Sequence, residues 1–86
     1  MHEMHLINDL MKKIITLAAD NQAEGISRVT VQLGALSHIS GDHFREHFEE
    51  AAAGTIAEKA SLEIIEEKDI HAPDAQDILL KDIEIY

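Results

Sequence analysis

The nine residues from Arg28 to Leu36 read Arg-Val-Thr-Val-Gln-Leu-Gly-Ala-Leu. Apolar and polar side chains alternate from the start of this stretch, which is the period-two pattern of a strand with one buried face. Val29, Val31 and Leu33 share the face that we expect in the core. Gly34 interrupts the pattern near its end, where a bulge or a close approach of another backbone segment is expected.

A helix is predicted on each side of this strand. Between Met4 and Gln22 the apolar residues recur at spacings of three and four, the period of a helix with one buried face. Gly25 is expected to close this helix in the left-handed conformation. After the strand, Ser40 or Asp42 can cap a second helix that runs to about Ala53. The two apolar stripes consist of Ile7, Leu10, Met11, Ile14, Leu17 and Ala18, and of Phe44, His47, Phe48, Ala51 and Ala52.

Two further strands are predicted in the second half of the chain, from Ser61 to Asp69 and from Ile78 to Tyr86. Leu62 and Ile64 face inward in the first of them. In the second, one face is expected to hold Leu79, Ile83 and Ile85. The order helix, strand, helix, strand, strand predicts an α+β fold, a two-layer sandwich with two helices on one face of a three-stranded sheet.

With 86 residues, the chain is expected to form one domain, residues 1–86, around a single core. Apolar residues make up 45% of the chain but only two Phe and one Tyr are aromatic, so aliphatic side chains must build that core. The predicted core places Val29, Val31, Leu33, Leu62, Ile64, Ile83 and Ile85 beneath Ile7, Leu10, Ile14, Phe44 and Phe48.

The charge of the chain argues against nucleic acid as a partner. Seventeen acidic residues face seven basic ones, a formal net charge of −10, and a phosphate backbone is repelled by such a surface. No apolar run approaches the roughly 20 residues that span a bilayer. The first residues also lack the cationic start of a secretory signal. We therefore expect a soluble, cytoplasmic protein that does not bind membranes.

The first two residues form a candidate metal site. There is no cysteine, so a bound metal must use nitrogen or oxygen ligands. The α-amine of Met1, the deprotonated amide nitrogen of His2 and the Nδ1 atom of its imidazole can close adjacent five- and six-membered chelate rings. These donors favour a planar arrangement, which suits Ni(II) or Cu(II) better than zinc. Met1 should survive processing, because His2 is large. Alternatively, this terminus is simply solvated.

Other histidines offer weaker candidate ligands. His5 lies one turn after His2 and is either an axial ligand or an exposed polar residue. His43 and His47 are four apart on one helix face, a spacing that can hold a metal between two imidazoles. No carboxylate is fixed as an obvious third ligand, although Glu46 and Glu50 are near. The alternative is a partly exposed pair of helix histidines. The two remaining histidines, His38 and His71, have no assignable partner.

Catalytic motifs are missing from the sequence. It contains no nucleophile motif and no glycine-rich phosphate loop, and the acidic pairs Glu49-Glu50 and Glu66-Glu67 are typical of solvated faces. We do not expect an enzyme.

Taken together, the segments resemble the HypA/HybF family of hydrogenase maturation proteins. The matching blocks occur in the order of the family and cover nearly the whole chain. They are Met1-His2-Glu3-Met4, the segment from Val31 to Ser37, Phe44 and Phe48, the segment from Gly54 to Ile64, and Ile83-Glu84-Ile85.

This resemblance implies a nickel metallochaperone. Family members deliver Ni²⁺ to the large subunit of [NiFe]-hydrogenase, and in some organisms to urease, together with a GTPase of the HypB type. The resemblance implies metal ligation at Met1, His2 and Glu3, through the amine, the amides and the imidazole, with the Glu3 carboxylate near the GTPase interface.

One departure from the family is large. Typical members carry a zinc domain with two Cys-x-x-Cys pairs between the second and third strands, and here the short connection 69–77 stands in its place. We therefore expect no structural zinc. Besides the nickel carrier, two alternatives stay open: a metal-free protein-interaction adaptor that retained the fold, and a nickel sensor that does not deliver the metal.

Overall fold

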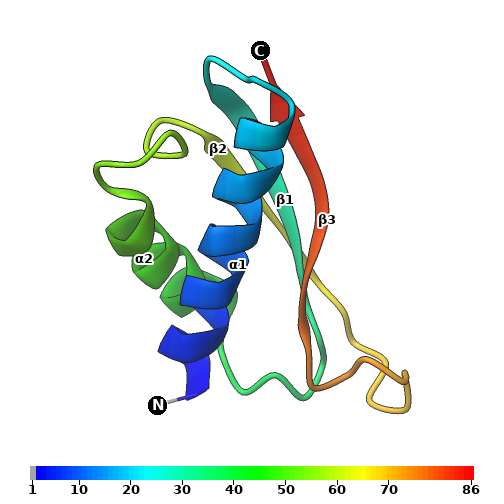
Figure 1. Ribbon diagram of the computed structural model, residues 1–86. Helices are drawn as coiled ribbons and strands as arrows, with labels where there is room; N and C mark the ends of the chain where they lie inside the picture. Colours follow the sequence, from blue (N-terminus) through cyan, green and yellow to red (C-terminus); the bar gives the residue numbers. More distant parts are fainter. Residues whose placement is uncertain (1) are drawn as a thin grey trace.

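The computed structural model describes the backbone of residues 2–86 and the side chains from His5 onward. Its elements follow the predicted order, and both helices lie on one face of the sheet (Figure 1). The predicted α+β two-layer fold is therefore confirmed. The elements are α1 (His2–Asp20), β1 (Ile26–Leu33), α2 (Gly41–Ala52), β2 (Ser61–Glu66) and β3 (Ile78–Ile85).

The first strand of the chain, β1, is the central strand of the sheet, whose order is β2-β1-β3. β2 runs parallel to β1, with Val29 opposite Leu62. A parallel pair cannot be joined by a tight turn, so the chain crosses over through α2 between these strands. β3 runs antiparallel to β1, with Val29 opposite Ile83. The inward residues of β1 therefore have neighbours on both sides.

The core lies between the sheet and the two helices. Val29, Val31 and Leu33 are buried, as predicted, and the two edge strands contribute half-buried residues, among them Leu62 and Ile64. Leu17 shares the predicted apolar stripe of α1 but is 37% exposed. The buried helical residues are Ile7, Leu10, Met11, Ile14, Ala18, Phe44, Phe48 and Ala52.

A bulge in β3 overturns part of the predicted strand face. Lys81 has no partner in β1, because the residues on either side of it pair with two consecutive residues of β1. The extra residue reverses the alternation, so Leu80 packs against the core in place of Leu79. Ile83 packs inward as predicted, whereas Ile85 is 38% exposed at the end of the strand. The pairs that flank the bulge are Thr30–Asp82 and Val31–Leu80.

The end of α1 differs from the prediction. Gln22, and not Gly25, takes the left-handed conformation, with φ of 54°. The amide of Gln22 donates to the carbonyl of Ala19 at 3.0 Å and that of Ala23 to Ala18 at 2.9 Å, the bonding pattern of a Schellman cap. The helix therefore ends at Asp20, before the predicted Gln22.

Gly25 instead leaves room for the last residue of the chain. A Cβ atom at Gly25 would lie 2.3 Å from the ring of Tyr86. Gly25 and Tyr86 also exchange backbone hydrogen bonds, which fasten the end of β3 beside the start of β1. A glycine is needed here for close packing and not for a turn.

Two strands end three residues earlier than predicted, β1 at Leu33 and β2 at Glu66. After Leu33 the chain bonds to the 67–77 connection: the amide of Gly34 donates to Asp77 at 2.9 Å and that of Leu36 to Ala75 at 2.7 Å. The close backbone approach expected at Gly34 is confirmed by these contacts. The connection is thus pinned against the loop that follows the central strand.

Candidate metal centre

The predicted terminal ligands lie at the start of α1. Met1 lies outside the described residues, and so do the side chains of His2 and Glu3, whose helical backbone is described. The first four N–H groups of a helix have no acceptor within it. The amides of His2 and Glu3 therefore make no hydrogen bond within the helix that deprotonation would break. His5 is an exposed residue of the same helix.

Among the predicted ligands, the structure brings His43 and His47 together in α2. Their Nε2 atoms lie 3.0 Å apart, and the ring centroids lie 4.6 Å apart. Successive turns of one helix place residues four apart on the same face, which is why this pairing follows from the spacing. Ser40 caps the helix, since its Oγ accepts from the amide of His43 at 3.1 Å. Of the two predicted caps, Ser40 rather than Asp42 holds the position.

The second ring nitrogen of His47 has a carboxylate neighbour. Its Nδ1 atom lies 3.2 Å from Oε1 of Glu50, one helical turn further on. This Nδ1 atom is fully buried, yet the contact lacks the alignment of a hydrogen bond. The distance brings the imidazole of His47 and the carboxylate of Glu50 together. A small rotation of either side chain would align them for a hydrogen bond. Sequence reasoning named Glu50 only as a nearby carboxylate.

The described side chains assemble no complete set of metal ligands. Among residues whose side chains are described, no three histidine, aspartate or glutamate side chains gather around a common point. His38 lies in the loop after β1 with φ of 63°, and His71 is exposed in the 67–77 connection. Neither approaches the pair in α2 within hydrogen-bond distance. The described portion of the chain thus offers a two-histidine site.

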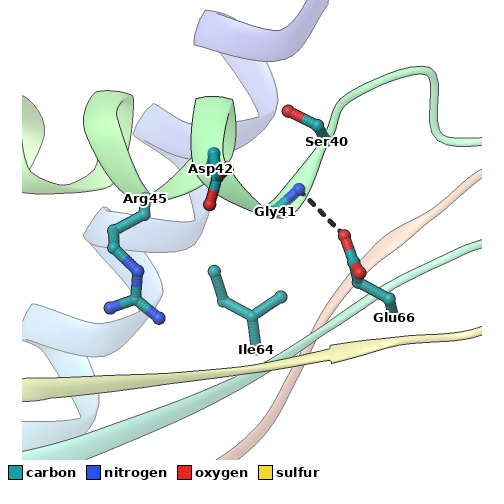
Figure 2. A pocket seen from close by; sticks show the side chains of 6 residues that line it. All are labelled: Ser40, Gly41, Asp42, Arg45, Ile64 and Glu66. Carbon is teal, nitrogen blue, oxygen red and sulfur yellow. Dashed lines mark hydrogen bonds between the residues drawn. The ribbon is translucent and has the colours of Figure 1, made fainter.

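The N-terminus of α2 is already occupied by a carboxylate of the chain itself. A depression of about 290 Å³ is lined by Arg45, Ile64 and the first turn of α2, whose side chains Figure 2 shows. Within it, Oε2 of Glu66 accepts from the amide of Gly41 at 2.9 Å. Free helix amides are what would attract an external anion there. Because Glu66 supplies that charge, we assign this depression a structural role.

The two acidic pairs singled out in the sequence differ in their hydrogen bonds. Glu49 and Glu50 are exposed on α2, as predicted. Glu66 and Glu67 instead bond to the backbone: Oε1 of Glu67 accepts from the amides of Lys68 at 2.9 Å and Asp69 at 3.2 Å. These bonds shape the turn that follows β2, a role that the sequence pattern did not indicate.

On the outer face of the sheet, Arg28 and Glu84 form an exposed ion pair across β1 and β3. The hydrogen bond from the guanidinium to Glu84, and the charge of that carboxylate, raise the pKa of Arg28 further above its usual range. Arg28 is therefore a fixed positive charge on this face of the sheet. Among the described residues, no helix is both long enough and apolar enough to cross a membrane.

Comparison with known proteins identifies one family. The model of the family described as hydrogenase/urease nickel incorporation, metallochaperone, hypA matches residues 1–72. The solution structure of the Ni metallochaperone HypA from Helicobacter pylori superimposes with a TM-score of 0.78 over 96% of each chain, at 22% sequence identity. At this identity the likeness concerns the fold.

Two curated relatives are more similar in sequence, and both are named hydrogenase maturation factor HypA. The protein from Bradyrhizobium sp. (strain ORS 278) is 38% identical over 68 residues, which are 79% of this chain and 60% of the relative. The protein from Archaeoglobus fulgidus is 37% identical over 71 residues, 81% of this chain and 64% of the relative. The chain thus spans less than two thirds of the length of these relatives.

Proposed function

Because this chain belongs to the HypA family of nickel-incorporation metallochaperones, we propose that it binds Ni²⁺ at its N-terminus and helps to deliver the ion during [NiFe]-hydrogenase maturation, and urease maturation where that enzyme is present. Nickel is the cargo in this proposal. The protein acts as a carrier and not as an enzyme.

The proposed ligands are Met1, His2 and Glu3. The α-amine of Met1, the amide and imidazole nitrogens of His2, and the amide nitrogen of Glu3 surround the ion. Amide nitrogens that have lost their proton are strong donors and favour the planar geometry of Ni(II). The observation that most strongly supports this proposal is the match of the family model from residue 1 onward.

The backbone of α1 supports chelation by neighbouring amides. In helical residues ψ is about −42°, which brings successive nitrogens to the same side, whereas an extended ψ of about +135° turns them apart. His2 is helical, so its own nitrogen and that of Glu3 are close to the arrangement that a five-membered chelate ring needs. Because these amides have no acceptor in the helix, metal binding breaks no helical hydrogen bond.

We further propose that residues 1–86 act as a single nickel-binding domain without zinc. The 67–77 connection contains no cysteine, and its backbone bonds to Gly34 and Leu36 tie it to the loop that follows β1. The partners in this proposal are a GTPase of the HypB type and the hydrogenase large subunit, and the compartment is the cytoplasm. The names of the relatives, hydrogenase maturation factors, support a role beside the hydrogenase maturation machinery. The two specific partners rest on the resemblance to the family.

Nickel titration of four proteins tests the terminal site. They are the native chain, a chain with two residues added before Met1, the His2→Ala variant, and a His71→Ala control that removes an exposed loop histidine. Planar Ni(II) with amide donors is diamagnetic and absorbs in the visible, and these signals report this site specifically. We expect them in the native chain and the control only. If the extended and His2→Ala chains gave the same signals, the terminal site would be rejected.

A maturation assay then separates carrier from adaptor. We expect the native chain to restore hydrogenase activity in a strain that lacks its own factor, and the His2→Ala variant to fail. Equal restoration by both proteins would favour the metal-free adaptor.

A further inference from the structure

We propose that His43 and His47 form a second, open binding site for a divalent transition-metal ion on α2. The two Nε2 atoms are the protein ligands, and water fills the other positions. This site uses none of the proposed terminal ligands and does not depend on the proposed function. The two imidazoles converge, and their Nε2 atoms are 3.0 Å apart.

The spacing of the two nitrogens fits a particular coordination geometry. With metal–nitrogen bonds of about 2.0–2.1 Å, a separation of 3.0 Å corresponds to a nitrogen–metal–nitrogen angle of about 95°. That angle is near the right angle of octahedral or square-planar ions such as Ni(II), and smaller than the tetrahedral angle of zinc. The two Nε2 atoms can therefore occupy two neighbouring coordination positions of a nickel ion.

The protons of the pair also favour chelation. Two Nε2 atoms at hydrogen-bond distance share one proton, so one ring donates and the other accepts. A metal ion takes the place of that proton and needs Nε2 lone pairs from both rings. His43 is exposed and can move its proton to Nδ1, where water accepts it. Nε2 of His43 then binds the metal, and its Nδ1–H donates to water, so both ring nitrogens have a partner.

Glu50 offers a partner to the other ring nitrogen of His47. When Nε2 of His47 binds a metal, its proton must sit on Nδ1, which is fully buried and 3.2 Å from Oε1 of Glu50. A small rotation lets Nδ1–H donate to this carboxylate. A histidine ligand held by a carboxylate at its other nitrogen is oriented and made more basic. Metal binding would thus give the buried Nδ1 atom the partner that it lacks.

The pair occupies an accessible flank of α2. Arg45 and Ala52 line depressions that α2 shares with β2, so they mark the flank that faces this edge strand. Each residue of an α-helix is rotated by about 100° from the one before it, so His43 and His47 lie on the opposite flank of α2. This flank is directed towards α1, which packs beside α2 and over β3. In Figure 1, the loop that leads into α2 and the start of α1 lie at the same end of the molecule. The exposed Nε2 side of the pair leaves room for water or a donor from another protein.

The experiment uses a background in which the terminal site is disabled, namely the chain with two added residues and His2→Ala. Ni(II) is titrated into this protein by calorimetry at moderate salt, which screens nonspecific attraction to the acidic surface. The proposal predicts one paramagnetic Ni(II) per chain. His43→Ala or His47→Ala in this background should lower the association constant at least about tenfold, and Glu50→Gln about 10- to 100-fold.

Control variants and a spectroscopic signal distinguish coordination from structural damage. His71→Ala should bind as the background does, and circular dichroism should show that every variant is folded. The paramagnetic Ni(II) ion should shift and broaden the imidazole NMR signals of His43 and His47 and leave those of His38 and His71 in place. If the His43→Ala/His47→Ala protein bound as many ions as His71→Ala, or if other histidine signals shifted instead, the second site would be disproved.

Discussion

A Cβ atom placed on Gly34 would lie 2.2 Å from the carbonyl oxygen of Ala75, closer than any side chain can approach. This contact holds the 67–77 connection against the end of the central strand. The amide of Gly34 also donates to Asp77 in the same connection, so the two segments are joined by packing and by hydrogen bonding.

Gly34→Ala should therefore destabilise the protein by about 1–3 kcal/mol, the usual range for overpacking. The obstacle is backbone and cannot swing away, unlike the end of a flexible side chain. Urea unfolding of the variant and of Ala35→Gly, which adds no atom at the neighbouring position, measures the effect. An unchanged midpoint for Gly34→Ala would show that the connection moves freely.

Ile14→Ala should lower the free energy of unfolding by about 2–5 kcal/mol, because Ile14 is completely buried and its loss leaves a cavity. Leu17→Ala on the same helix is the matched control, since Leu17 is 37% exposed and its removal leaves no closed cavity. Equal losses in the two variants would contradict the orientation of α1 over the sheet. Thermal and urea unfolding both report the difference.

Ser40→Ala should cost about 0.5–2 kcal/mol through loss of the cap on α2, because the amide of His43 loses its acceptor. Ser37→Ala is a control, as none of the described hydrogen bonds involves the hydroxyl of Ser37. Chemical denaturation of both variants is the measurement. A larger loss for Ser37→Ala would place the cap elsewhere.

Removal of metal should leave the fold intact. The elements are held by the core and the sheet, and the chain has no thiolate ligands for a structural zinc. We expect the same Tm and circular dichroism spectrum before and after dialysis against a strong chelator. A marked fall in Tm would reveal a structural metal, with His43 and His47 as its first suspected ligands.

Nickel binding at the terminus should weaken as the pH is lowered. The α-amine of Met1, the amides of His2 and Glu3, and the imidazole must all be free of protons at their ligand atoms, so protons compete with the ion. Affinity is therefore highest on the alkaline side and falls steeply below neutrality. Titrations across this range, read by the diamagnetic planar signal, measure it. A flat profile would argue against amide ligands.

Local patterns were sufficient to predict the elements of this fold. The spacing of apolar residues in α1 and the alternation of Val29, Val31 and Leu33 depend on the period of each element alone. The proposed terminal chelate is of the same kind. Its donor atoms belong to consecutive residues, so they were named from the sequence without any knowledge of the fold.

Only the tertiary structure decided features that join distant segments. The central place of β1 and the bulge at Lys81 arise from pairing between strands, so no alternation within β3 could show that Leu80 replaces Leu79 in the core. Gly25 was predicted as a helix cap, yet it makes room for Tyr86, which lies far away in sequence. The spacing of His43 and His47 predicted that they meet. The packing of the helices and the sheet decides two further features of this pair. It buries Nδ1 of His47 beside Glu50, and it sets which flank of α2 the pair occupies.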